Sequence, residues 1–385
     1  MRRAFIMKRT FVLAPDSFKE SMSAKVACNA MERGIRKVFP NAEIIHVPMA
    51  DGGEGTIDAL VDGNEGTRVE VTVSGPLPTE KVTTYYGLLA DKKTAVIEMA
   101  KANGIELLAE EKRNPLVTST YGTGEMIQAA LDQGVKTIII GIGGSVTNDG
   151  GAGMAQALGV RFFDSENREL PMGGGALAAL SRIDTTELDP RIKETEIIIA
   201  SDVTNPLTGP KGASVVFGPQ KGATPEMVEE LDKALAHYAE VIERDLGLEI
   251  KEQPGAGAAG GLGAGLLAFT EAKMQSGIEL VIELTHLEEK IVRADYIFTG
   301  EGGMDFQTKF GKTPYGVAKI AKKYNKPVLA CAGYIGEQVE VLYEEGITAI
   351  FGILAKAGSL DEALKSGEAN LERTVENIVR ILDKK

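Results

Sequence analysis

Residues 136–154 read KTIIIGIGGSVTNDGGAGM, and this stretch predicts the class of fold. The apolar run has the length of a strand, so Lys136–Ile142 is expected to be a buried strand. The glycine-rich turn GGSVTNDGG follows it directly, and a helix is expected to begin where that turn ends. A strand, a polar glycine-rich turn and a helix in this order are typical of a parallel sheet covered by helices.

The same order of elements recurs elsewhere in the chain, with the turns APDSFK, ADGGEG, SDVTNP and TGEGGMD. Strands are expected before these turns at Phe11–Ala14, Glu43–Val47, Ile197–Ala200 and Tyr296–Thr299, and again at Pro327–Ala330 and Ala349–Leu354. Helices are expected at Ala24–Phe39 (with Ser23 as N-cap), Thr56–Val61, Thr123–Gln133 and in the amphipathic stretch from Leu360.

The segment from Thr67 to Ala100 has a different pattern, with alternating stretches such as RVEVTV that indicate antiparallel hairpins. A chain of 385 residues also exceeds the usual size of a single core. We therefore predict a two-domain α/β protein. Residues 1–72 plus 293–385 are expected to form a discontinuous parallel-sheet domain, and 73–292 an inserted α/β domain that contains the hairpins. The cleft between the two domains is the expected active site.

Composition excludes several classes of function. The net charge is −13, from 42 Lys and Arg against 55 Asp and Glu, which disfavours nucleic acid as a partner. The longest apolar runs are far too short to cross a membrane. The N-terminal apolar run is too short for a signal peptide, and Met7 is a candidate alternative start. Cys28 and Cys331 lie in apolar stretches and are expected to be buried thiols, which favours a cytoplasmic location.

Two familiar nucleotide signatures have partial matches in the chain. Gly311-Lys312-Thr313 ends like a phosphate-binding P-loop, but Phe306 stands where that motif needs a glycine. Residues 255–260 (GAGAAG) do fit a dinucleotide fingerprint, although the polar KEQ and Pro254 precede them instead of a strand. A close-packed helix start or a phosphate loop is the competing interpretation of this segment.

Carboxylates and glycines gather in the turns that follow the strands. In open α/β sheets, ligands bind at the carboxyl ends of the strands, where glycines allow close approach and helix N-termini attract anions. Each turn alone could be an ordinary cap or turn, but the set together favours bound metal and a proton acceptor. Lys19 and Lys312 are the cations best placed to offset phosphate charge. The carboxylates are Asp16, Asp51, Glu54, Asp149, Asp202, Glu301 and Asp305.

These motifs resemble the type 1 glycerate kinases. The resemblance rests on APDSFKES (14–21), ADGGEGT (50–56), IGIGGSVTNDGGAGM (140–154), SDVTNPL (201–207), FGPQKGA (217–223), PGAGAAGGLGA (254–264) and TGEGGMD (299–305). It implies ATP-dependent phosphorylation of D-glycerate, a requirement for Mg²⁺ and two α/β domains. Two positions depart from the family pattern: Val146 stands where alanine is common, and Gly303 stands where many relatives carry arginine.

The predicted function is therefore an ATP-dependent kinase that converts D-glycerate to a phosphoglycerate, with 2-phosphoglycerate favoured over 3-phosphoglycerate. Phosphoryl transfer mainly needs positioning and charge neutralisation, which glycine loops, carboxylates and lysines supply. Two alternatives stay open: an NAD(P)-dependent hydroxy-acid reductase, which rests on GAGAAG, and a non-catalytic sugar-acid sensor. Glycerate and ATP are the expected partners, and a homodimer stays open.

Roles can be assigned to single residues on this basis. Asp202 is the expected general base, with Lys19 and Asp16 as the other catalytic residues and Asp16 as the second candidate for the base. Glycerate is expected to bind Ser17, Asp51, Gly52 and Gly53. ATP is expected to bind Gly143, Gly144, Ser145, Thr147, Asn148 and Lys312, and Mg²⁺ to bind Asp149 and Asp305.

Overall fold

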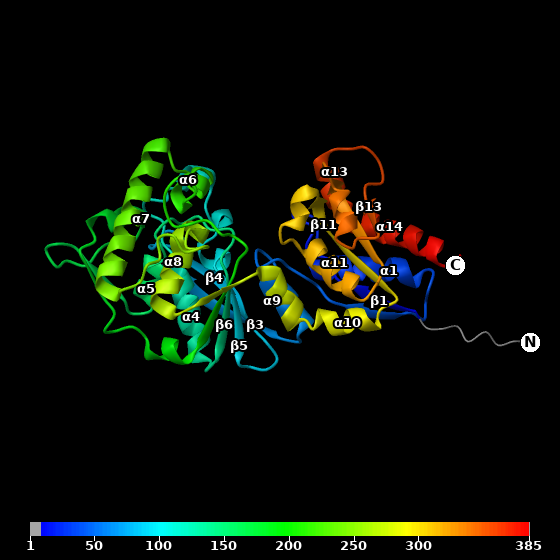
Figure 1. The fold of residues 1–385 in the computed structure, drawn as a ribbon, viewed down its shortest axis with the longest axis horizontal. Coiled ribbons are helices and arrows are strands. Elements are labelled where there is room, and N and C mark those ends of the chain that lie inside the picture. The colour runs from blue at the N-terminus through cyan, green and yellow to red at the C-terminus, as the bar shows by residue number, and fades with distance from the viewer. Residues whose placement is uncertain (1–8, 385) are drawn as a thin grey trace, which may run out of the picture. The chain divides into compact units, whose positions relative to one another are not determined.

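The computed structural model describes residues 9–384; Met7, the candidate alternative start, lies outside them. The described chain divides into two compact units (Figure 1). Unit 1 contains the described residues through Asp51, then Asp58–Glu65 and the chain from Gly277 onward, and unit 2 contains Gly52–Ile57 and Gly66–Ser276. The predicted α/β class is confirmed. The predicted domain limits, 1–72 plus 293–385 and 73–292, stay a prediction, because compactness alone does not show that each part folds independently.

Unit 1 is built on a five-stranded sheet in the order β13-β12-β11-β1-β2, and every neighbouring pair is parallel. Phe11 of β1 lies opposite Tyr296 of β11 on one side and Ile44 of β2 on the other, so distant parts of the sequence share one sheet. The strands are β1 (Thr10–Leu13), β2 (Glu43–His46), β11 (Tyr296–Met304), β12 (Val328–Ile335) and β13 (Ala349–Gly352).

Helices cover this sheet, and apolar side chains of both form the core of unit 1. Phe11, Phe298 and Cys331 from the strands pack in one cluster with Cys28 and Met31 from α1. Both cysteines are buried thiols, as expected. The helices are α1 (Ala24–Arg36), α2 (Thr56–Gly63, which begins in unit 2), α9 (Gly277–Leu284), α10 (Leu287–Arg293), α11 (Thr313–Lys323), α12 (Val341–Glu344), α13 (Leu360–Lys365) and α14 (Gly367–Leu382).

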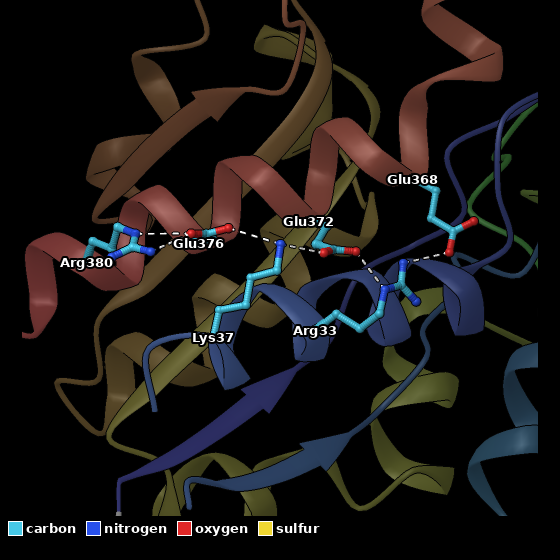
Figure 2. A network of polar contacts seen from close by, with 6 residues as sticks. All are labelled: Arg33, Lys37, Glu368, Glu372, Glu376 and Arg380. Carbon is cyan, nitrogen blue, oxygen red and sulfur yellow. Dashed lines mark hydrogen bonds and ion pairs between the residues drawn. The ribbon is translucent and has the colours of Figure 1, made fainter. Parts of the chain in front are cut away.

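The first and last helices lie side by side (Figure 1). Ser23 caps α1, as predicted, by accepting a hydrogen bond from the Val26 amide at 3.3 Å. Gly34 allows close contact, because a β-carbon there would lie 2.5 Å from the Glu372 carbonyl oxygen of α14. A ladder of surface ion pairs runs along the same contact (Figure 2). Its members are Arg33 with Glu368 and Glu372, Lys37 with Glu372 and Glu376, and Arg380 with Glu376.

Unit 2 is built on a six-stranded mixed sheet in the order β10-β9-β6-β5-β4-β3. β10, β9, β6 and β5 run parallel, whereas β4 pairs antiparallel with both β5 and β3, which gives the hairpins predicted for this region. The strands are β3 (Thr67–Ser74), β4 (Lys81–Leu88), β5 (Thr94–Glu98), β6 (Thr137–Gly141), β9 (Glu196–Ala200) and β10 (Lys273–Gln275), with a separate antiparallel pair β7 (Arg161–Phe163) and β8 (Arg182–Asp184).

The longest helix of unit 2, α7, was not predicted. It begins after Thr224, whose hydroxyl caps it, with Pro225 at the first helical position. Its inner face places Leu235, Tyr238 and Ile242 in a hydrophobic core of this unit. The helices of unit 2 are α3 (Ala100–Asn103), α4 (Tyr121–Asp132), α5 (Ala152–Ala157), α6 (Ala213–Phe217), α7 (Pro225–Leu246) and α8 (Ala258–Thr270).

Parallel strands bring their carboxyl ends to the same edge of a sheet, so the turns singled out in the sequence meet within each unit. APDSFK, ADGGEG and TGEGGMD follow or end strands of unit 1, and GGSVTNDGG and SDVTNP follow strands of unit 2. Within residues 9–384, no helix combines the length and the apolar composition that a membrane span requires.

Candidate functional site

Asp16 is a buried carboxylate at the carboxyl edge of the unit 1 sheet. It follows β1, and only 9% of the residue is exposed. Its Oδ1 accepts a hydrogen bond from the Ser17 amide at 2.6 Å, and its Oδ2 accepts one from Thr313 Oγ1 at 2.5 Å. Thr313 is the first residue of α11, so the start of this helix fixes the orientation of the carboxylate.

Two further carboxylates act on Asp16 electrostatically. Burial, together with the negative charges of Asp51 and Glu301, raises the pKa of Asp16 to about 7, against the hydrogen bonds from Thr313 and Ser17. Burial likewise raises the pKa of Glu301 to about 7, and Asp51 adds to this effect while Lys312 and Thr308 oppose it. Carboxylates that follow β1, follow β2 and lie within β11 therefore form one coupled group.

Lys312 supplies the cation of this group. Its Nζ lies 3.5 Å from Glu301 Oε2 and 3.4 Å from the Gly303 carbonyl oxygen, to which it donates a hydrogen bond. Gly303 itself has room for a side chain, because an added β-carbon would meet nothing closer than Tyr334 Cδ1 at 3.8 Å. Lys19 is exposed in the turn after β1, and its backbone nitrogen would lie 3.3 Å from a β-carbon added at Gly302.

The GGSVTNDGG turn follows β6 in unit 2, and only its first two glycines are exposed. Gly143 and Gly144 are exposed, with Gly144 in the left-handed region at φ +77°, whereas residues 145–151 are buried. The Ile105 amide donates to the Gly144 carbonyl at 2.9 Å, and the Val146 amide donates to the Asn103 carbonyl at 3.1 Å. The turn is therefore held by the residues that follow β5, and its exposed residues are Gly143 and Gly144.

Gly52 and Gly53 lie against the same region of unit 2. A β-carbon at Gly141 would lie 2.8 Å from the Gly52 carbonyl oxygen, and one at Gly143 would lie 3.5 Å from Gly53 Cα. The structure thus brings two residues predicted to bind substrate beside one predicted to bind nucleotide. Glu98, at the end of β5, accepts a hydrogen bond from the Ile57 amide at 2.8 Å and so fixes the start of α2.

The side chains further along the turn point into unit 2. Asn148 is fully buried and donates through Nδ2 to Ser214 Oγ at 2.9 Å. Thr147 is also fully buried, and neither its Oγ1 nor Asn148 Oδ1 has a hydrogen-bond partner among the described residues. The predicted contacts of these two side chains with ATP stay predictions. In their buried position they support the turn from behind.

Asp149 is fully buried within a set of donors. Its Oδ2 accepts from the Thr120 amide at 2.8 Å and the Gly153 amide at 3.2 Å, its Oδ1 accepts from the Gly151 amide at 3.2 Å, and the Thr120 hydroxyl lies within 3.1 Å of both oxygens. Burial raises the pKa of this carboxyl, and these hydrogen bonds oppose the shift. The predicted role of Asp149 as a metal ligand stays a prediction, and its contacts favour a structural role.

The two other predicted acidic residues lie in more open positions. Asp202 is exposed two residues beyond the end of β9. Asp305 is partly exposed and caps the short 3-10 helix Phe306–Lys309, because its Oδ1 accepts from the Gln307 amide at 2.8 Å. Within residues 9–384, no three His, Cys, Asp or Glu side chains are grouped as a metal site. A magnesium ion that is held mainly by phosphates needs only one or two carboxylates, which Asp305 fits better than Asp149.

The GAGAAG segment is packed against the turn after β6. Three consecutive residues, Ala259, Gly260 and Gly261, have left-handed backbone conformations at the start of α8. A β-carbon at Gly260 would lie 2.0 Å from the Thr147 carbonyl oxygen, and one at Gly261 would lie 2.7 Å from Gly150 Cα. These glycines serve close backbone packing, and no strand leads into them as a dinucleotide fingerprint requires.

Comparison with known proteins identifies the family. A family model described as the glycerate kinase family matches residues 11–383. The chain belongs to the glycerate kinase family. The match covers both units and all the turns described above, so it extends well beyond a shared fold.

Individual members of the glycerate kinase family resemble the chain along its length. A glycerate kinase of Haemophilus influenzae is 52% identical over 372 residues, which cover 97% of this chain and 98% of the relative. A glycerate 2-kinase of Escherichia coli K12 is 51% identical over 371 residues, covering 96% and 97%. The crystal structure of a candidate glycerate kinase 2 from Salmonella typhimurium LT2 has a TM-score of 0.88 at 48% identity, and 98% of each chain is covered.

Sequence reasoning grouped Glu301 with the other turn carboxylates but gave it no individual role, and it gave no role to Thr313 or Lys221. The structure places all three next to predicted site residues. Glu301 was visible in TGEGGMD, but β11 extends through Met304, so Glu301 lies inside the strand. Thr313 could have been noted as the start of a helix after Gly-Lys. Lys221 lies in the family motif FGPQKGA, but a lysine in a polar segment is expected to be exposed, so no role was predicted for it.

Proposed function

We propose that this chain transfers the γ-phosphoryl group of ATP to a hydroxyl of D-glycerate and forms 2-phosphoglycerate. The observation that carries the proposal is the glycerate kinase family match over residues 11–383. The Escherichia coli relative named a glycerate 2-kinase supports the position of transfer. The reductase alternative rested on the GAGAAG motif alone. The glycines of this motif pack against residues 147–150, so the motif gives little support to a dinucleotide site.

Glycerate is proposed to bind residues that follow β1 and β2 in the sequence. A small anion in an acidic protein needs local donors, and Ser17 and Lys19 lie in the turn after β1. Asp16 is held by Thr313, so it can orient a substrate hydroxyl from a fixed position. Asp51, Gly52 and Gly53 complete the proposed set after β2.

ATP is proposed to bind the turn after β6 through Gly143, Gly144 and Ser145. The two glycines are exposed, and backbone amides without side chains can approach phosphate oxygens closely. Thr147 and Asn148 would stabilise this turn from behind. Lys312 is proposed as a further cation for the phosphates of ATP, and its Nζ lies 3.5 Å from Glu301 Oε2.

In the proposed step, the glycerate hydroxyl oxygen attacks the γ-phosphorus, the bond from that phosphorus to the β,γ-bridging oxygen breaks, and ADP leaves. The hydroxyl proton passes to the Asp202 carboxylate, which is exposed after β9 and so can receive it. Mg²⁺, when bound, neutralises charge on the β- and γ-phosphates, and Asp305 is the carboxylate proposed to hold it.

We also propose a cellular location and consider the oligomeric state. The two cysteines are free, buried thiols, which supports a cytoplasmic location. A homodimer remains a hypothesis, which light scattering of the purified protein would decide.

An ADP-release assay with D-glycerate, glycolate, lactate and tartronate in parallel tests the function. We expect ADP release with D-glycerate at least about tenfold above the other acids, because glycolate and tartronate lack the hydroxymethyl group of glycerate and lactate lacks its terminal hydroxyl. Phosphorus NMR of the product should give the 2-phosphate. Glycerate binding without ADP release would support a sensor instead, and formation of 3-phosphoglycerate would overturn the proposed position of transfer.

A further inference from the structure

Lys221 is a buried cation directly behind the turn after β6. Only 1% of the residue is exposed, and its Nζ donates 2.7 Å hydrogen bonds to Ser145 Oγ and to the Thr147 carbonyl oxygen. More than 70 residues separate the lysine from both acceptors. A fully buried ammonium is costly unless charge or hydrogen bonds compensate it, so its presence needs a reason.

The backbone around Lys221 holds the side chain in this position. Lys221 ends the short 3-10 helix Pro219–Lys221, and its amide donates to the Gly218 carbonyl at 2.9 Å. Gly222 follows at φ +90°, and a β-carbon there would lie 2.4 Å from the Arg113 carbonyl oxygen. The turn that carries the lysine is therefore fixed, and the side chain enters unit 2 from a rigid base.

The hydrogen bond from Lys221 also sets the direction of the Ser145 hydroxyl. An ammonium can only donate, so Ser145 Oγ is the acceptor and its own proton must point elsewhere. Ser145 follows Gly144 at the accessible end of the turn and is 6% exposed. Its hydroxyl therefore keeps a proton to donate, in the residue next to the exposed Gly143 and Gly144.

The charge balance behind the turn favours an anionic ligand. The negative charge of Asp149 acts on Lys221, but the oxygens of Asp149 already accept hydrogen bonds from Thr120, Gly151 and Gly153. Burial lowers the pKa of Lys221 to about 7, and Asp149 opposes this shift. An anion bound at Ser145 would add a second negative charge near the ammonium and stabilise its protonated form.

We propose that Lys221 is a positioning residue for the phosphoryl donor: it holds Ser145 as a hydrogen-bond donor and places a positive charge behind the turn that binds the phosphates of ATP. The inference rests on the proposed function, because it takes Gly143–Ser145 as the ATP site. Lys221 does not touch the substrate and acts through Ser145 and the backbone of Thr147.

The test compares Lys221→Met, which keeps the length of the side chain and removes its charge, with the intact chain. Lys233→Met is the matched control, because Lys233 is exposed on α7, where it pairs with Glu229. Calorimetry gives the dissociation constants of ATP and D-glycerate separately, and thermal unfolding checks the fold. We expect Lys221→Met to weaken ATP binding about tenfold and glycerate binding less than twofold, with no change in the control.

Ser145→Ala provides a second variant that removes only the hydroxyl, and it carries the test if Lys221→Met does not fold. We expect it to weaken ATP binding about fivefold, and adding Ser145→Ala to Lys221→Met should cause little further loss, because both act through one contact. Unchanged ATP affinity in either folded variant, or equal weakening of ATP and glycerate, would overturn the proposal. If the intact protein binds ATP but does not phosphorylate glycerate, the proposed function is wrong and the Lys221 proposal can still be tested. If the intact protein does not bind ATP, both the proposed function and the Lys221 proposal are wrong.

Discussion

Thr313 donates a 2.5 Å hydrogen bond to the Asp16 carboxylate, although 297 residues separate the two in sequence. The contact joins the start of α11 to the turn after β1 at the carboxyl edge of the unit 1 sheet. Asp16 is buried there beside Asp51 and Glu301, so its protonation is coupled to the folding of this unit.

Asp16 should make the stability of the protein depend on pH. Its pKa is about 7 in the folded chain, against an ordinary value of 3.8 for an exposed aspartate, so the folded state holds the proton over a range where the unfolded state has lost it. Stability therefore falls as pH rises from about 4 to 7, and the penalty is complete above pH 7. We expect Asp16→Asn to reduce the loss of stability between pH 5 and 8 by about 2 kcal/mol, measured by urea unfolding.

The exposed Asp361→Asn on α13 is the control for this experiment and should leave the pH dependence unchanged. Glu301 also has a pKa raised to about 7, so part of the pH dependence should survive in Asp16→Asn. Identical pH profiles for Asp16→Asn and the intact chain would contradict the coupling.

Asp202→Asn tests the general base. We expect turnover to fall by about 10² or more while the dissociation constant of glycerate changes only a few-fold, because proton transfer matters in the transition state. Single-turnover kinetics and calorimetry measure the two quantities. Weakened glycerate binding with intact turnover would show that the base assignment is wrong and would make Asp16 the candidate.

Asp149→Asn separates a metal ligand from a structural carboxylate. An amide nitrogen would face donors of Thr120, Gly151 or Gly153, so we expect a loss of about 2–4 kcal/mol in the free energy of unfolding. The Mg²⁺ concentration for half-maximal activity should stay within about twofold, measured at a temperature where the variant is folded. Unchanged unfolding together with a strongly raised Mg²⁺ requirement would instead support direct binding of the metal.

Gly34→Ala tests the contact between the first and last helices. The added β-carbon would lie 2.5 Å from the Glu372 carbonyl oxygen, so α1 and α14 must move apart, at a cost of about 1–3 kcal/mol. Gly63→Ala at the end of α2 is the control, because its β-carbon would meet only Thr285 Cγ2 at 3.6 Å. Thermal unfolding should show a lower midpoint for Gly34→Ala alone, and equal midpoints for the two variants would refute the close packing.

The local sequence determined the elements and the class of fold. The isoleucine run before GGSVTNDGG predicted β6, Ser23 predicted the cap of α1, and alternation after Thr67 predicted the hairpin strands, because periodicity and capping depend on neighbours in sequence. The family motifs also placed most candidate residues at strand ends before any contact was known.

Tertiary structure decided which of those residues meet and in what environment. No local pattern brings Thr313 to Asp16 or Lys221 to Ser145, since each pair is joined by the packing of elements far apart in the chain. Burial, which raises the pKa of Asp16 and lowers that of Lys221, exists only once those elements enclose the side chain. The sequence by itself therefore determined the strands, turns and reactive groups of this protein, and only the folded chain decided which of them are enclosed and held together.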